Sequence, residues 1–249
     1  MLAYLRKIRK NLIESGSAQK YFLYAIGEIA LVVIGILIAL QINNWNEYQK
    51  ERKVELKTLQ ELAQNLEANI IRLKINLDRN TYDNQDTDFI LSVFNERMPY
   101  TDSLDKIFPF ALNPVDIGSF LTYTGYESLK NTGFDIISDD GLKQEIISLF
   151  EESYQELEAR YNRVEPTRVE LGQFVRKHFY RKSMDYAFTP INFEGLSEDK
   201  NLTSWLYTIK GYRSWVSEEL MASKQETESV LGQIRASLSE RGINGGSED

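Results

Sequence analysis

The sequence of 249 residues lacks cysteine and has only one histidine, 5 prolines and 14 glycines. Without cysteine the chain can form neither a disulfide nor a thiolate metal site. Aromatic residues make up 12% of the chain, and with so little proline and glycine this excludes low-complexity disorder. The net charge of −8 argues against a nucleic-acid-binding protein, because such a protein normally carries a basic face.

Charge and apolar residues are segregated along the chain. Residues 1–40 carry a net charge of +3, which leaves −11 for residues 41–249. Residues 22–42 read FLYAIGEIALVVIGILIALQI and contain a single ionisable side chain. At about 1.5 Å per residue this helix would cross roughly 30 Å of hydrocarbon. Aromatic residues flank the run, including Trp45 and Tyr48, as is typical of headgroup regions. The sequence predicts one transmembrane helix over residues 21–42.

A cleaved signal peptide is the alternative, because it also opens with basic residues and an apolar run. Here the run is longer than usual, and its exit, ALQINNW, offers no small-x-small cleavage site. We therefore expect an uncleaved anchor. Basic residues lie on both sides of the span, and the short tail of residues 1–20 should decide the orientation. The expected location is the cell inner membrane, crossed once, with the N-terminus cytoplasmic and residues 43–241 periplasmic.

The tail has apolar residues at helical spacing: Leu2, Leu5, Ile8 and Leu12. Basic residues lie between them and are candidates for headgroup contact: Arg6, Lys7, Arg9 and Lys10. This pattern is typical of an amphipathic helix on an anionic leaflet. It fits a simple topology signal equally well.

Two stretches resemble a known family. The sequence KYFLYAIGEIALVVIGILIALQINNWNE, residues 20–47, resembles the N-terminal signature of an uncharacterised Bacteroidota family of single-span membrane proteins. A weaker stretch, YESLKNTGFDIISDDGLKQEIISLF, residues 126–150, resembles that family's segment in which a glycine turn precedes a helix. The resemblance implies an inner-membrane anchor with a helical outer domain. It supplies no catalytic residue, because the family's function is unknown.

Apolar residues after the span repeat with alternating spacings of 3 and 4, which is typical of a coiled coil or helix bundle. They are Leu56, Leu59, Ala63, Leu66, Ile70, Leu73 and Leu77. Leu62, Ile71 and Ile75 would widen this seam, and the extra width favours a bundle over a two-stranded coiled coil. No helix breaker lies between residues 42 and 77, so the membrane helix can continue directly into a helix over residues 43–80.

Two more long helices are predicted over residues 139–180 and 198–241. Asp139 and its neighbours supply an N-cap and an acidic first turn, whereas Pro166 should kink or break the second helix. Similar lengths favour antiparallel packing, with the first helix rising from the membrane, the second descending and the third rising.

The intervening residues 81–138 are expected to form a distal cap with short helices near 86–97 and 118–131. Arg241 and Gly242 should end the last helix, and residues 242–249 should be flexible. Because no period-2 alternation is long enough for a sheet, the predicted fold class is all-α.

Glu28 is the sharpest candidate for function, because an ionisable group within a span is costly and often functional. It lies about 9 Å from the start of the span at 1.5 Å per residue, which permits snorkelling or a contact with Lys20. The other interpretation is an inter-subunit or ion-pathway role. Small residues at Gly27, Gly35 and Ala39 suit close helix contact, so the sequence predicts self-association of the span.

His178 is the only histidine and lies on an apolar seam, where we expect a packed side chain, because no motif supplies partners for a metal site or a catalytic triad. Four basic residues surround it: Arg176, Lys177, Arg181 and Lys182. They would end a descending helix, so they are candidates for headgroup contact. Complementation of the helix dipole is the simpler interpretation.

No phosphate-binding loop, nucleophile elbow or HExxH motif occurs in the sequence. The aspartates at 83, 86, 88, 139 and 140 lack EF-hand spacing. We therefore expect no catalytic residue, no cofactor and no metal, and an enzyme is the least supported class.

The sequence favours a membrane-anchored periplasmic helical scaffold or interaction module in an oligomer or envelope complex. Its expected partners are the lipid bilayer, a second copy of the chain and another membrane or envelope protein. The alternatives are a periplasmic sensor or ligand-binding bundle that signals through a membrane partner, and an oligomeric channel or ion-coupled component that uses Glu28.

Overall fold

The computed structural model describes residues 18–115 and 121–240. The chain divides into two compact units, residues 1–54 and 55–249. One long helix, α2 (Ala18–Asn95), contributes residues to both. The amphipathic helix predicted for the tail, and the helix end and flexible segment predicted from residue 241 onward, lie outside the described residues.

In the first unit, the described chain consists of the N-terminal part of α2. The most apolar window of 18 residues has a mean hydropathy of 2.5, and none of that window is buried. Within the described ranges, α2 is the one helix long and apolar enough to cross a membrane. It continues without a break past Ile42 and Leu77, as the absence of helix breakers predicted.

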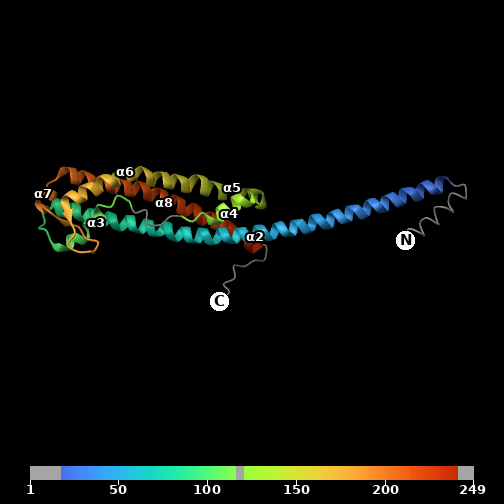
Figure 1. Ribbon diagram of the computed structural model, residues 1–249, viewed down its shortest axis with the longest axis horizontal. Helices are drawn as coiled ribbons and strands as arrows, with labels where there is room; N and C mark the ends of the chain where they lie inside the picture. The colour runs from blue at the N-terminus through green and yellow to red at the C-terminus, as the bar shows by residue number, and fades with distance from the viewer. Residues whose placement is uncertain (1–17, 116–120, 241–249) are drawn as a thin grey trace, which may run out of the picture. The chain divides into compact units, whose positions relative to one another are not determined.

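Within residues 55–115 and 121–240, the regular structure of the second unit is helical apart from one two-stranded pairing, so the all-α prediction is confirmed (Figure 1). The pairing is antiparallel and places Phe179 opposite Pro190. The elements after α2 are η1 (Asp102–Lys106), α3 (Phe108–Ala111), α4 (Thr124–Thr132), η2 (Phe134–Ile136), α5 (Asp140–Ser148), the π-helical turn η3 (Leu149–Ser153), α6 (Tyr154–His178), β1 (Phe179–Tyr180), β2 (Thr189–Pro190), α7 (Phe193–Ser197) and α8 (Lys200–Glu240).

Ion pairs between α2 and α8 show that these helices run in opposite directions. Glu67 pairs with Arg235 at 2.7 Å, and Asp88 pairs with Lys210 at 2.5 Å. Residue numbers therefore rise along α2 while those of its partners fall along α8. The predicted antiparallel bundle is confirmed, but the prediction that the last long helix rises in the same direction as the first is wrong.

The helix formed by α5 and α6 runs parallel to α2, so the prediction that it descends is wrong. Ser138, just before α5, donates its backbone N–H to Glu55 near the start of the second unit at 2.7 Å. Phe179, directly after α6, lies in one apolar cluster with Ile90 near the end of α2. Figure 1 shows α5 beside α4 at one end of this unit and the end of α6 beside α3 and α7 at the other.

The course of the chain between α2 and α4 explains this direction. Asn113 donates to the Asp83 carboxylate at 3.0 Å, whereas the Thr122 N–H donates to the Asn69 side chain at 2.6 Å. Asn113 therefore lies beside the later part of α2 and Thr122 beside an earlier part, an arrangement that helical periodicity does not reveal. This direction changes the expected position of four basic residues: Arg176, Lys177, Arg181 and Lys182. They lie at the end of the second unit opposite Glu55. Their headgroup contact was predicted from a descending helix, so that prediction loses its basis.

Helix boundaries differ from the predictions in three places. The short helix expected at 86–97 is the last part of α2, and the helix expected at 118–131 is α4, Thr124–Thr132. Pro166 does not break α6. Proline has no N–H to donate to the Asn162 carbonyl, but both residues are exposed, so water can donate to that carbonyl instead. The predicted cap is confirmed, because the Asp139 carboxylate accepts from the N–H groups of Gly141 and Leu142.

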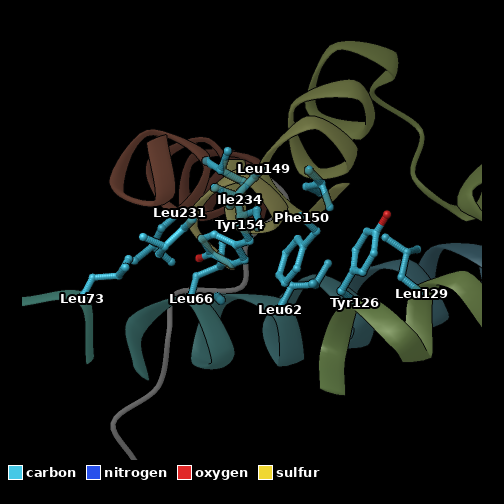
Figure 2. Close-up of a cluster of buried hydrophobic side chains, with 14 of the residues drawn as sticks. Leu62, Leu66, Leu73, Tyr126, Leu129, Leu149, Phe150, Tyr154, Leu231 and Ile234 are labelled. Atoms are coloured by element: carbon cyan, nitrogen blue, oxygen red, sulfur yellow. The ribbon is translucent and has the colours of Figure 1, made fainter. Parts of the chain in front are cut away.

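The larger core lies between α2, α4, α6 and α8. Figure 2 shows leucines of α2, including Leu62 and Leu66, facing Phe150, Tyr154 and Ile234 from the other helices. The Tyr126 ring stacks on Phe150 with centroids 4.3 Å apart. Burial of this apolar surface is the main stabilising contribution to the second unit.

The seam predicted along α2 is partly wrong. Leu62 is fully buried, but Ile71 and Ile75 are 61% and 40% exposed. Polar residues with the same 3-and-4 spacing as the leucines also lie buried on the inner face of the helix, namely Asn69, Asn76, Asn80, Asp83 and Thr87.

Candidate functional site

We call the end of the second unit at which α2 ends the distal end. Arg213 of α8 holds this end together. This side chain is fully buried. Its guanidinium donates to the carbonyl oxygen of Asp83 at 2.7 Å, to that of Phe110 at 2.5 Å and to that of Asn113. Burial lowers the pKa of Arg213 to about 10, and nearby Asp83 opposes that shift. The group therefore remains charged at neutral pH and joins α8, α2 and the chain after α3.

A second polar centre at the distal end is the buried Asp105. Its carboxylate accepts hydrogen bonds from the Tyr100 and Thr189 hydroxyls, each at 2.5 Å, and pairs with Lys182 at 3.3 Å. Burial, followed by the hydrogen bond to Asp105, raises the pKa of Tyr100 to about 12. The Asp105 carbonyl also accepts from the Phe188 N–H at 2.8 Å. These bonds fix the β1–β2 hairpin against η1.

A cleft of about 630 Å³ opens between the hairpin, α6 and the chain after α3. This volume is within the range of small-molecule sites. Leu171, Val175 and Phe179 contribute apolar surface to it. Three arginines contribute positive charge: Arg168, Arg176 and Arg181. No Asp or Glu is among the described residues that line it. We call this feature the arginine cleft.

Two of these arginines are held in place by neighbours. Arg168 donates from Nη2 to the Val115 carbonyl at 2.9 Å, and its Nε lies 3.6 Å from the Glu165 carboxylate. Arg181 lies over the rings of Tyr186 and Phe188, 5.8 and 5.4 Å from their centroids. Such cation–π contacts leave the edge of a guanidinium able to donate to an anion. The arginine cleft can therefore hold a negatively charged group beside an apolar surface.

Of the basic residues around His178 that the sequence singled out, Arg176 and Arg181 line this cleft. Lys182 instead pairs with Asp102 and Asp105, and Lys177 is exposed. Arg168 was missed as a site residue by the reasoning from the sequence. Its position about two helical turns before Arg176 was a usable signal, since residues eight apart lie on the same side of a helix.

His178 packs against Phe174, with ring centroids 4.4 Å apart and a tilt of 24°. In the part of the chain that the structure describes, no group of three His, Asp or Glu side chains is placed to hold a metal ion. The stacking is consistent with the packed histidine expected from the sequence.

The candidate residues of the span lie along the first part of α2. Glu28 is half-buried, beside Ala25 and Val32. A side chain added at Gly27 or Gly35 would meet no atom within 4 Å. Ala39 is exposed. The role of these residues in helix–helix contact therefore stays a prediction. Arg6, Lys7, Arg9 and Lys10 lie outside the described residues.

The fold is that of an all-α protein with one long apolar N-terminal helix. Residues 28–157 match a family of unknown function, DUF6090. The match covers just over half of the chain, and the protein belongs to this family. The matched part runs from the apolar part of α2 through α4 and α5 into α6, and ends before the arginines of the cleft. No curated protein and no solved structure matches the chain.

Proposed function

We propose that this protein is a membrane-anchored helical interaction module. The observation that carries the proposal is the apolar window of α2, of which no part is buried. The second unit has its own apolar core, so the exposed side chains of the window need another cover. Leaving so much contiguous apolar surface in water is unfavourable, and a bilayer is the cover that suits its length.

The proposed orientation places the N-terminus in the cytoplasm and residues 55–240 on the periplasmic side of the inner membrane. Its support is the charge asymmetry, +3 before residue 41 and −11 after it, together with the shortness of the tail. Because the chain has no cysteine, single-cysteine labelling can test this directly.

The labelling experiment compares Ser103→Cys, at an exposed position of the second unit, with Ser17→Cys in the tail. We expect a maleimide that cannot cross the inner membrane to modify Ser103→Cys in cells with a permeabilised outer membrane. Ser17→Cys should react only after lysis. The opposite pattern would overturn the orientation.

We further propose that the module associates with a second copy of itself along α2. Four apolar side chains of α2 in the second unit are exposed: Ile71, Ile75, Tyr82 and Phe89, at 61, 40, 65 and 44%. Their spacings of 4, 7 and 7 place them on one face of the helix. We call this face the α2 stripe. A second copy suits it best, because two chains anchored through the same helix in one membrane would present their stripes in parallel.

Cysteine cross-linking tests this association in native membranes. Ile75→Cys and Tyr82→Cys place thiols on the α2 stripe, and Val169→Cys, 55% exposed on α6, is the matched control. Disulfides need Cα atoms within about 7 Å. We expect oxidation to yield dimers of the two stripe variants and not of the control. Failure of both stripe variants to cross-link would overturn the self-association.

The small residues of the span add a second test. We expect Gly35→Ile to lower the native mass of the chain in mild detergent, because Gly35 and Ala39 would allow close helix approach. The control is Ala30→Ile, the same kind of enlargement on another face of α2. Equal masses for the wild type and both variants would remove the span from the interface.

A further inference from the structure

We infer that the arginine cleft is a binding site for an organic anion that joins a carboxylate or phosphate group to an apolar body. The first observation is the unequal charge of its lining. Three guanidiniums line the cleft without an acidic side chain among its described lining residues, on a chain whose net charge is −8. A concentration of one sign of charge opposed to the net charge of the chain attracts ligands of the opposite sign.

The second observation is the prior positioning of these guanidiniums. Arg168 is held by the Val115 carbonyl, and Arg181 by two aromatic rings. Arg176 lies one turn after Gly172, and its Nη1 lies over that residue, at 3.6 Å from the position of an added Cβ, which is an ordinary van der Waals distance. Planar guanidiniums bind carboxylate and phosphate oxygens with two parallel hydrogen bonds. Side chains already held in place lose less conformational freedom when a ligand binds.

The third observation is the apolar wall beside the charges. Leu171, Val175 and Phe179 share the lining with the arginines. A free inorganic anion would use only the guanidiniums, whereas an anion with an aromatic or aliphatic body would also bury apolar surface. The cleft volume of about 630 Å³ accommodates a small molecule or the end of a side chain with such a body.

The position of the cleft makes this inference independent of the membrane proposal. All of its lining residues belong to the second unit. The full-length chain in a neutral detergent therefore suffices for the test, and loss of anchoring or of self-association would leave ligand binding unchanged.

The experiment measures binding of three probes by isothermal titration calorimetry: phenyl phosphate, inorganic phosphate and benzyl alcohol. We expect phenyl phosphate to bind most tightly, because it alone engages both the guanidiniums and the apolar wall. Raising the salt concentration should weaken its binding, since the attraction is electrostatic at an open site. No heat of binding with phenyl phosphate, or equal affinity for benzyl alcohol, would overturn the inference.

Variants locate the site. The Arg176→Gln and Arg181→Gln changes should each weaken phenyl phosphate binding by about tenfold, as expected for the loss of a charge-assisted hydrogen bond. Lys177→Gln is the matched control, because Lys177 is an exposed cation on the same helix that does not line the cleft. Equal weakening by Lys177→Gln, or unchanged affinity in both arginine variants, would show that the anion binds elsewhere and would overturn the assignment.

Discussion

Arg213 of α8 donates a hydrogen bond of 2.7 Å from Nη1 to the backbone carbonyl oxygen of Asp83 on α2, and both side chains are buried. The same guanidinium bonds to the carbonyls of Phe110 and Asn113. One cation thus links backbone carbonyls of α2, of α3 and of the chain directly after α3. The position of one wall of the arginine cleft, which includes Asn113, depends on this contact.

Replacing Arg213 by Met should lower the free energy of unfolding by about 3 to 5 kcal/mol, because several buried acceptors lose their donor at once. Arg235→Met on the same helix is the control. Its partner is Glu67 and its side chain is 61% exposed, so its loss should change stability by less than about 1 kcal/mol. Urea denaturation followed by circular dichroism measures both, and similar losses in the two variants would contradict the structural role of Arg213.

Replacing each of two glycines by alanine should change the stability of the fold in opposite directions. A Cβ at Gly125 of α4 would lie 3.3 Å from the backbone of Leu62 on α2, so Gly125→Ala should destabilise the fold by about 1 to 3 kcal/mol through overpacking. Gly211 lies inside α8, and a Cβ there would meet nothing within 4 Å. Gly211→Ala should therefore stabilise the fold by up to about 1 kcal/mol. Thermal unfolding compares them, and a shift of the same sign in both would disprove the close packing of α4 on α2.

Glu151 should make stability depend on pH in the acid range. Its carboxylate accepts hydrogen bonds from the Tyr126 hydroxyl at 2.8 Å and from Lys130 at 3.1 Å, and these partners lower its pKa from the ordinary value of 4.5. The folded state therefore holds fewer protons on Glu151 than the unfolded state does. The resulting stabilisation is present above about pH 4.5 and is lost as the pH falls through the lowered pKa.

The measurement for Glu151 is the difference in unfolding free energy between the wild type and Glu151→Gln at pH 7 and at pH 3. We expect the unfolding free energy of the wild type to be higher than that of the variant at pH 7, and this difference to be smaller at pH 3. A difference that does not change with pH would show that the carboxylate has the same pKa in the folded and unfolded states.

The sequence was sufficient to predict the helices but not their arrangement. The 3-and-4 spacing predicted the buried leucines of α2, and the cap at Asp139 predicted the start of α5, because these are local properties. The direction of α6 depends on the bonds of Asn69 and Asn113 to residues far away in the sequence, which periodicity does not encode. Because the prediction gave this helix the opposite direction, it placed the basic residues around His178 at the wrong end of the bundle.

The polar core was missed for a related reason. Asn69, Asn80 and Thr87 continue the spacing of the buried leucines of α2, but nothing local shows which group of another segment will pair with each of them. Arg213 left a usable signal, since it lies between Ile209 and Val216 with the same alternating spacing as the buried apolar residues of α8. A charged residue at a core position of a helix indicates a buried partner, and this rule would have identified it.

Alkaline extraction of the full-length chain tests the central claim, membrane anchoring through α2, most directly. Membranes from expressing cells are washed at high pH, and the mass of the protein in each fraction is determined. We expect the intact chain to stay in the membrane pellet and a variant with Val33→Arg and Leu37→Arg to be released, because charges at the centre of a span are costly. Recovery of the wild-type chain in the wash, or as a fragment lacking the apolar segment, would contradict the claim.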